Sequence, residues 1–266
     1  MAILGFVGAG NMGYAMLKGA LKVFKKEELT YTDINSIRLE EIKKETGIEY
    51  VNSNKELVKQ VKYIVLAVKP QYLDGVLEEV KTVVKEEQVI IAIAPGIEIF
   101  HYKKFLGEKI KVVRAMPNTP ALVNEGMTGI CFSEDTFNQE EKTVIYKFFD
   151  SFGKFEEVSE NLMNAVTCVS GSSPAYVYMF IEALADSAVK YGIPRDKAYV
   201  FAAQTVMGSA KMVLETKEHP GKLKDQVCSP GGTTIAAVSV LEECGFRSSV
   251  IKAGDACYEK STSFKK

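Results

Sequence analysis

The sequence predicts a doubly wound α/β domain over residues 1–159, followed by an all-helical domain over residues 160–266. Short runs rich in Val and Ile alternate with amphipathic segments in the first part, whereas the second part has the composition of helices throughout. Strands buried on both faces and separated by helices form parallel sheets, so we expect a Rossmann-type doubly wound parallel sheet. A chain of 266 residues with 47% hydrophobic residues can build two such cores.

Seven strands are expected in the first domain, together with three helices besides the one that follows the glycine-rich turn described below. Gly47 follows the amphipathic segment 36–46 and predicts its C-terminal cap, while Pro70 suits the first turn of a helix over 70–83. A third helix is expected over 139–152. The expected strands are residues 2–7, 29–32, 63–68, 89–93, 111–115, 127–132 and 154–158.

The helical domain contains two long segments that are apolar almost all round. From Ala175 to Tyr191 the only charged residues are Glu182, Asp186 and Lys190, which are spaced by four and form one narrow stripe. The segment 197–214 is similar. The charged stripe and the Gly and Pro interruptions disfavour a membrane span. A domain of this size cannot bury both helices alone, so we expect a homodimer, or a larger oligomer built from dimers.

Charge and cysteine usage exclude several classes of protein. The net charge is −1 and the lysines are scattered, so no general attraction to nucleic acid is expected. The five cysteines are odd in number and far apart, which predicts reduced thiols, no disulfide framework and no metal site. With no basic and apolar leader before the first strand, we expect a cytoplasmic protein.

A glycine-rich turn follows the first expected strand and precedes a helix expected over residues 14–23. In this context a G-x-G-x-x-G motif predicts dinucleotide binding. Gly8 would make the tight turn, Gly10 would admit the pyrophosphate, and Gly13 would let the helix pack on the strand. The six residues of the turn are Gly8, Ala9, Gly10, Asn11, Met12 and Gly13.

The residues after the second expected strand leave the choice of cofactor open. Asp33 ends that strand, where a carboxylate accepts from a ribose 2′-hydroxyl and repels a 2′-phosphate, which favours NADH. Asn35, Ser36 and Arg38 follow at once and can serve a phosphate. NADH and NADPH both remain candidates.

A second glycine-rich turn, from Cys228 to Gly232, precedes a helix-like run that begins with Thr233 and Thr234. Pro and Gly leave backbone N–H groups uncovered there, and a helix N-terminus attracts carboxylates and phosphates. An ordinary turn before a helix is the alternative reading of the same residues.

The chain has no obvious catalytic base of the kind that alcohol dehydrogenases use. Its two histidines, His101 and His219, lie in a helix-like segment and a turn with no polar constellation around them. Reduction of a C=N bond needs less help, because a protonated imine already carries the charge that attracts a hydride. A hydroxyl donor and an oriented carboxylate are then sufficient.

Six motifs together resemble the pyrroline-5-carboxylate reductase family over residues 1 to about 259. They are Gly-Phe-Val-Gly-Ala-Gly-Asn-Met-Gly (5–13), Leu-Ala-Val-Lys-Pro-Gln (66–71), Met-Pro-Asn-Thr-Pro-Ala (116–121), Ser-Gly-Ser-Ser-Pro-Ala-Tyr (170–176), Glu-Ala-Leu-Ala-Asp (182–186) and Leu-Lys-Asp-Gln-Val-Cys-Ser-Pro-Gly-Gly-Thr-Thr (223–234). The resemblance implies reduction of 1-pyrroline-5-carboxylate to L-proline with NADH or NADPH, the last step of proline biosynthesis, by a homodimer or a ring of dimers.

The resemblance also implies a set of site residues. Thr234 and Ser229 would be the catalytic hydroxyls, with Thr234 donating to the ring nitrogen, and the backbone of Gly231, Gly232 and Thr233 would hold the substrate carboxylate. Met116, Pro117 and Asn118 would line the floor of the nicotinamide pocket. Beyond the glycine loop, the cofactor contacts would be Asn54, Ala67, Val68, Lys69, Pro70, Ala94 and Gly96.

Two departures and two alternatives accompany the resemblance. Pro95 replaces a small residue, and Ser173 stands where glycine is common, which affects the fine shape of the pocket. A hydroxy-acid dehydrogenase of the 3-hydroxyisobutyrate type would share the architecture, but it would carry a catalytic lysine, and none occurs from Ser170 to Val189. A nucleotide-sensing protein without chemistry would need the first glycine loop alone.

Overall fold

The computed structural model describes residues 3–263 and divides into two compact units. Among the described residues, unit 1 comprises 3–172 together with 257–263, and unit 2 comprises 173–256. The boundary expected near Ser159 falls just after the last strand of the sheet, and a few short helical turns follow it within unit 1.

Unit 1 is built on a seven-stranded sheet in the order β2-β1-β3-β4-β5-β6-β7. The first five strands are parallel, and the order reverses at β1, which lies between β2 and β3. Ligands bind at such a switch point, outside the carboxyl ends of the strands. The strands are β1 (Leu4–Val7), β2 (Leu29–Thr32), β3 (Tyr63–Leu66), β4 (Val89–Ala92), β5 (Lys111–Met116), β6 (Gly126–Phe132) and β7 (Gly153–Glu157).

One strand pair departs from the predicted parallel arrangement. β6 runs antiparallel to β5, with Val113 opposite Phe132 and Met116 opposite Gly129. Only a short segment with the 3₁₀ turn η2 (Thr119–Val123) joins the two strands, and a parallel neighbour needs a longer crossover. β7 is then parallel to β6, since the helix between them completes a crossover of the ordinary kind.

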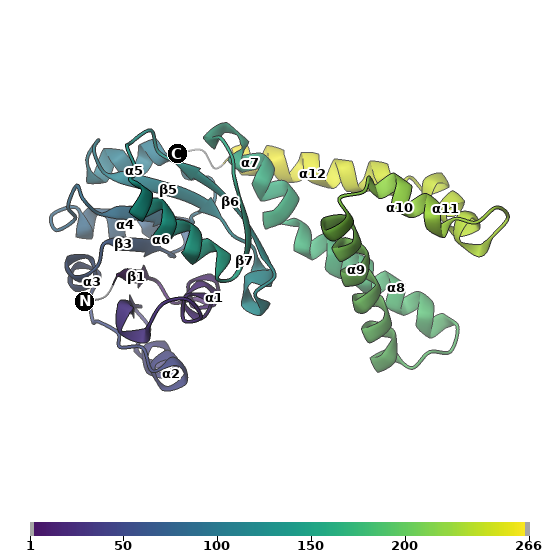
Figure 1. Ribbon diagram of the computed structural model, residues 1–266, viewed down its shortest axis with the longest axis horizontal. Helices are drawn as coiled ribbons and strands as arrows, with labels where there is room; N and C mark the ends of the chain where they lie inside the picture. The colour runs from purple at the N-terminus through teal and green to yellow at the C-terminus, as the bar shows by residue number, and fades with distance from the viewer. Residues whose placement is uncertain (1–2, 264–266) are drawn as a thin grey trace. The chain divides into compact units, whose positions relative to one another are not determined.

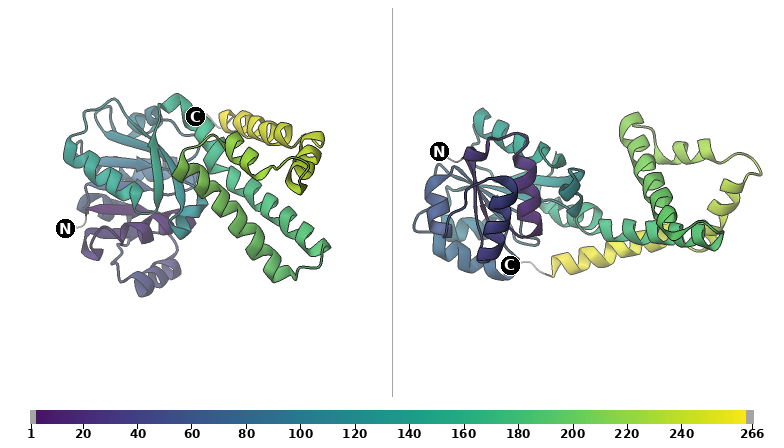
Figure 2. Two further views of the ribbon diagram at one scale, coloured as in Figure 1. Left: turned by 45° about the vertical axis from the view of Figure 1, so that its right-hand side comes forward. Right: turned by 90° about the horizontal axis from the view of Figure 1, so that it is seen from below.

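Helices cover both faces of the sheet and bury two separate apolar cores (Figures 1 and 2). Met16, Leu17, Ile42 and Phe148 belong to one core and Leu57, Leu73 and Tyr102 to the other. The first face carries α1 (Asn11–Ala20), α2 (Ser36–Thr46) and α6 (Gln139–Asp150); the second carries α3 (Asn54–Gln60), α4 (Pro70–Val80) and α5 (Ile99–Leu106).

Unit 1 contains further short turns outside the two main helical layers. Lys26–Glu28 (η1) leads into β2, and Glu160–Leu162 (η3) follows β7. The helix α7 (Met163–Val166) then runs directly into a π-helical turn, η4 (Thr167–Gly171). π-helical turns are rare and occur often at functional sites.

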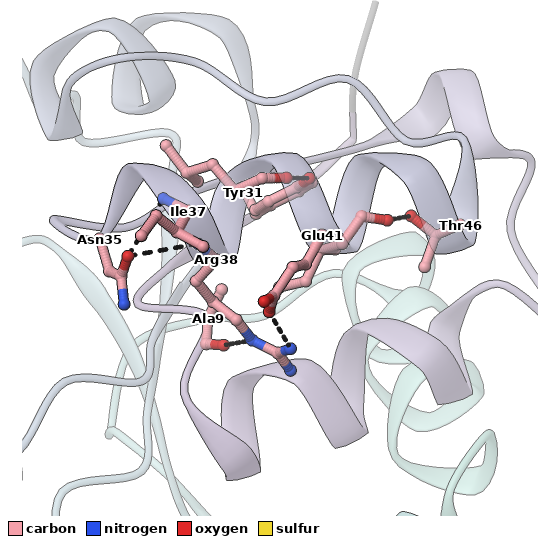
Figure 3. Close-up of polar contacts among 9 residues, drawn as sticks. Ala9, Tyr31, Asn35, Ile37, Arg38, Glu41 and Thr46 are labelled. Atoms are coloured by element: carbon pink, nitrogen blue, oxygen red, sulfur yellow. Dashed lines mark hydrogen bonds and ion pairs between the residues drawn. The ribbon is translucent and has the colours of Figure 1, made fainter.

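The predicted limits of α2 and its C-terminal cap at Gly47 are confirmed. Asn35 is its N-cap, and Oδ1 of Asn35 accepts the backbone N–H groups of Ile37 at 3.1 Å and Arg38 at 3.3 Å (Figure 3). Gly47 ends the helix with φ at +69°, a left-handed conformation that suits glycine. The helix therefore has the predicted limits at both ends.

Unit 2 consists of helices with very little core of their own. The helices α8 (Ser173–Lys190) and α9 (Arg195–Thr216) form an antiparallel pair (Figure 2). Among the described residues, this pair buries only Ala185, Ala198 and Ala202. Large side chains such as Met179, Phe201 and Ile251 are more than 60% exposed. The remaining helices are α10 (Pro220–Val227), α11 (Thr233–Glu243) and α12 (Phe246–Thr262), whose last turns belong to unit 1. No helix within residues 3–263 has the length and apolar character needed to span a bilayer.

Candidate active site

The first glycine loop adopts the tight geometry that its sequence predicts. Gly8 has φ at +95°, and a Cβ on it would lie 2.8 Å from the carbonyl oxygen of Ala67. A Cβ on Gly13 would lie 2.2 Å from the carbonyl oxygen of Gly8. The start of α1 can therefore approach the end of β1 this closely only because neither residue has a side chain. Gly10 differs, because its Cβ would meet no atom within 4 Å. Space beside Gly10 is thus open to a ligand, at the N-cap of α1.

Two adjoining cavities form a groove along the carboxyl ends of the parallel strands. One, of about 290 Å³, lies on the β2 side, and the other, of about 460 Å³, lies on the β4 and β5 side. Gly10, Ala67, Val68 and Lys69 line both cavities, so the groove is continuous past the glycine loop. A dinucleotide fits this layout, with its pyrophosphate at the loop and its two nucleosides on either side.

The β2 end of the groove is marked by a fixed carboxylate. Oδ2 of Asp33 accepts the N–H of Ala9 at 2.7 Å, and Oδ1 accepts the N–H of Asn35 at 2.9 Å. Each oxygen keeps further lone pairs for a ligand hydroxyl. Two side chains that the sequence reasoning did not select, Ile34 and Tyr72, also line this cavity, and both are more than half exposed.

Arg38 lies beside the same loop but is held by contacts within the protein (Figure 3). Its Nε donates to the carbonyl oxygen of Ala9 at 3.4 Å, one of its terminal nitrogens pairs with Glu41 at 3.2 Å, and its guanidinium lies 4.5 Å from the ring centre of Tyr14. Burial and then the hydrogen bond to Glu45 raise the pKa of Tyr14, which keeps this ring neutral.

The β5 end of the groove is lined by Met116 and Pro117. The next residue, Asn118, is 8% exposed and does not line either cavity. Its Oδ1 accepts the N–H of Met127 at 2.8 Å, and its Nδ2 donates to the carbonyl oxygen of Ser170 at 3.0 Å. The Asn118 amide therefore joins three backbone segments of unit 1.

The second glycine-rich turn forms a compact cradle within unit 2. The N–H of Gly232 donates to the carbonyl oxygen of Ser229 at 3.0 Å, and Gly231 has φ at +67°. Gly232 is the N-cap of α11 and no side chain caps that helix, so its first N–H groups are exposed to a ligand. Thr233 and Thr234 are the first two residues of the helix, as the sequence predicted.

Comparison with known proteins identifies the family. A family model for pyrroline-5-carboxylate reductase dimerisation matches residues 160–264, and one for coenzyme F420-dependent NADP oxidoreductases matches residues 3–96. The pyrroline-5-carboxylate reductase of Escherichia coli strain K12 is 46% identical over 266 residues, covering 99% of this chain and 98% of the relative. This chain belongs to the pyrroline-5-carboxylate reductase family.

Solved structures of pyrroline-5-carboxylate reductases share the fold over the full chain. The enzyme from Plasmodium falciparum, described with NADP bound, has a TM-score of 0.89 and 36% identity, covering 100% of this chain and 98% of that one. The enzyme from Coxiella burnetii has a TM-score of 0.92 and 32% identity, with coverage of 100% and 99%. The Rossmann-type domain and the helical dimerisation region predicted for a pyrroline-5-carboxylate reductase are confirmed.

Within unit 1 of this reductase, most of the expected cofactor residues lie along the groove. Ala9 and Gly13 are instead buried in the loop that they shape, and Asn35 caps α2. Ile93 and Pro95 line the groove, whereas their neighbours Ala94 and Gly96 do not. The residues that do line it are Gly8, Gly10, Asn11, Met12, Asp33, Asn54, Ala67, Val68, Lys69, Pro70, Met116 and Pro117.

Proposed function

We propose that the protein reduces the C=N bond of 1-pyrroline-5-carboxylate to give L-proline. The observation that carries this proposal is the continuous groove past Gly10, whose open space and helix N-cap suit a dinucleotide pyrophosphate, in a chain of this family. A nicotinamide cofactor supplies the hydride, and no strong base is required.

The cradle of unit 2 is the proposed substrate site. The backbone of residues 231–233 would hold the substrate carboxylate at this uncapped helix N-terminus. Its donors would be the N–H groups of Gly231 and Thr233, because the N–H of Gly232 already donates to the carbonyl oxygen of Ser229. Ser229 and Thr234 would supply hydroxyls. Thr234 would orient the ring nitrogen through a hydrogen bond, because a threonine hydroxyl is too weak an acid to protonate an imine outright; water would be the final proton source.

For the cofactor, we propose a preference for NADH. The Asp33 carboxylate is fixed by two backbone N–H groups at the wall of the β2-side cavity, where it would accept from ribose hydroxyls and repel a 2′-phosphate. Arg38, the nearest candidate to offset that charge, is engaged with Glu41 and the Tyr14 ring. The choice rests on residues of this chain, whatever cofactor a relative binds.

We further propose a homodimer, or a larger assembly of dimers, located in the cytoplasm. Exposed apolar side chains on α8, α9 and α12 support burial of unit 2 against a second copy. The five cysteines are all free, which suits a reducing compartment.

The deciding experiment mixes the purified protein with 1-pyrroline-5-carboxylate and either NADH or NADPH, and follows the loss of absorbance of the reduced nicotinamide. We expect turnover, with NADH the better cofactor and proline as the product. Cofactor binding without turnover would instead favour a nucleotide sensor. Oxidation of a 3-hydroxy acid by NAD(P)⁺ in place of imine reduction would favour the hydroxy-acid dehydrogenase. The same assay run with both cofactors tests the role of Asp33.

A further inference from the structure

The contacts of Asn118 are neither those of a residue that lines a ligand pocket nor those of a residue in an ordinary turn. Both ends of its buried amide bond to backbone groups far away in sequence, on β6 and on the π-helical turn. One N–H and one lone pair of the amide remain. A buried side chain that joins three backbone segments fixes their relative positions.

The carbonyl of Ser170 needs this contact for a chemical reason. In a regular helix the carbonyl of residue 170 would accept from the N–H of residue 174, which is Pro174 and has no N–H. The π-helical turn also changes the helical hydrogen-bond pattern from i+4 to i+5, since the N–H of Ser172 donates to the carbonyl of Thr167 at 2.8 Å. Nδ2 of Asn118 therefore donates to a carbonyl whose regular i+4 partner is a proline.

The π-helical turn packs on the wall of the groove. A Cβ on Gly171 would lie 2.6 Å from Cε of Met116, so the turn and this side chain are in direct contact. Met116 and Pro117 line the β5-side cavity, and Asn118 follows them in the chain. The place of this wall thus depends on the segments that Asn118 joins.

We propose that Asn118 is a positioning residue for the nicotinamide half of the cofactor. It holds the Met116–Pro117 wall in place through the π-helical turn, rather than contacting the nicotinamide itself. Because the pyrophosphate lies at the loop and the adenosine on the β2 side, the wall at the β5 end faces the nicotinamide. This inference rests on the proposed function, in that it takes a nicotinamide dinucleotide as the ligand.

The test compares a whole cofactor with a fragment that lacks nicotinamide. Calorimetric titrations of the full chain with NADH and with ADP-ribose would be made for the wild type, Asn118→Asp and Gly171→Ala. The first variant removes the donor to Ser170. The second pushes the flexible end of Met116 without touching Asn118, and we expect it to fold because that end can move. If NADPH binds more tightly than NADH, it and 2′-phospho-ADP-ribose replace the pair.

Gln88 provides a matched control at the amino ends of the parallel strands, just before β4 and opposite to the groove. It is 5% exposed, and its amide also joins backbone segments, with Nε2 donating to the carbonyls of Val58 and Val61 at 2.6 Å each. Gln88→Glu makes the same chemical change away from the groove. It should leave the affinities for both ligands within about twofold of the wild type.

We expect both test variants to bind NADH about tenfold more weakly than the wild type does, and to keep their affinity for ADP-ribose within about twofold of the wild-type value. An equal loss of affinity for the two ligands, or an unchanged affinity for NADH, would overturn the proposal. Loss in Asn118→Asp but not in Gly171→Ala would also overturn it, because that pattern indicates a direct contact. If Asn118→Asp fails to fold, Asn118→Ser, which also takes away the amide donor to Ser170, replaces it in the same comparison. A wild type that binds neither cofactor would refute the proposed function instead.

Discussion

The backbone N–H of Ala9 donates to Oδ2 of Asp33 at 2.7 Å, and this bond fastens the glycine loop to the end of β2. One carboxylate thereby shapes the loop and faces the cavity on the β2 side. Loop geometry and cofactor choice consequently depend on the same side chain.

Replacing Asp33 by serine should shift the preference toward NADPH. A serine hydroxyl can still accept the N–H of Ala9, but it removes the charge that repels a 2′-phosphate. We expect the ratio of NADPH to NADH affinity to rise about tenfold, or about 1.4 kcal/mol. Calorimetric titration with each cofactor measures the ratio. An unchanged ratio with intact binding would show that Asp33 serves the loop alone.

Gly10→Ala separates ligand binding from folding. The new Cβ meets no protein atom within 4 Å and φ is −64°, so the melting temperature should stay within about 2 °C of the wild type. Cofactor affinity should fall at least tenfold, because the methyl group occupies the space proposed for the pyrophosphate.

Gly75→Ala, in the middle of α4, is the control for this change. It also has open space around the added methyl group, and it should stabilise the helix by roughly 0.5–1 kcal/mol. Retained cofactor affinity in Gly10→Ala would argue against the assigned pyrophosphate position.

Thr234→Ala should lower the turnover number about 100-fold with little change in stability. The hydroxyl is the proposed donor to the substrate nitrogen, and alanine is a better helix former at the start of α11. Steady-state kinetics with thermal unfolding provide the measurement.

Ser239→Ala is the matched control on α11, since its Oγ only donates to the carbonyl of Ile235 at 2.9 Å. Its rate should match the wild type. Near-full activity of Thr234→Ala would remove Thr234 from the mechanism.

Stability should fall in acid through Glu141. Burial acts to raise the pKa of this carboxyl, but hydrogen bonds from Lys111, the N–H of Asn138 and Lys62 outweigh it and hold the pKa below its usual value. A lowered folded-state pKa stabilises the protein above the unfolded-chain value of about 4.3, and that stabilisation is lost as the pH falls through the folded-state pKa.

Glu141→Gln tests the source of this pH dependence. At pH 7 the variant should be less stable by about 3 kcal/mol, because two lysines lose their partner. The difference from the wild type should shrink between pH 5 and pH 2, as measured by urea unfolding. A constant difference across that range would exclude ionised Glu141 as the cause.

An acidic side chain on the apolar surface of unit 2 should prevent assembly. Phe201 on α9 is 62% exposed, and Phe201→Glu should convert the oligomer into monomers that melt several degrees lower, independently of protein concentration. Sedimentation velocity measures the change. Lys154→Glu on β7 of unit 1 is the control and should sediment like the wild type.

Several features of the fold could be predicted because short-range chemistry determines them. The N-cap by Asn35 and the left-handed Gly47 fix both ends of α2, and the limits of β2 agree as well. The helix after the glycine loop was misplaced: it runs from Asn11 to Ala20 rather than over 14–23. Gly10 itself is the N-cap, so the close approach of Gly13 to Gly8 belongs to the first turn of α1.

Other features depend on the tertiary structure and could not be predicted from the hydrophobic periodicity of the sequence. The direction of β6 follows from a short connection, and the π-helical turn follows from an i+5 hydrogen bond that no hydrophobic pattern encodes. Asn118 was expected to contact nicotinamide, but it does not line the groove, and the proposal above gives it a positioning role instead. Its bonds to Ser170 and Met127 join positions too far apart in sequence for spacing rules to connect. Tyr72 could have been found as an exposed aromatic one turn after Lys69-Pro70.

The chain leaves unit 1 after Ser172 and returns to it at Cys257, whose Sγ donates to Oγ of Ser172 at 3.2 Å. Unit 2 is therefore an insertion whose two attachment points touch each other. Domains attached in this way can be exchanged between related proteins, because the host chain needs no new path to close the gap. Residues 173–256 thus form a natural cassette for chimeras that combine the nucleotide-binding half of one reductase with the assembly half of another.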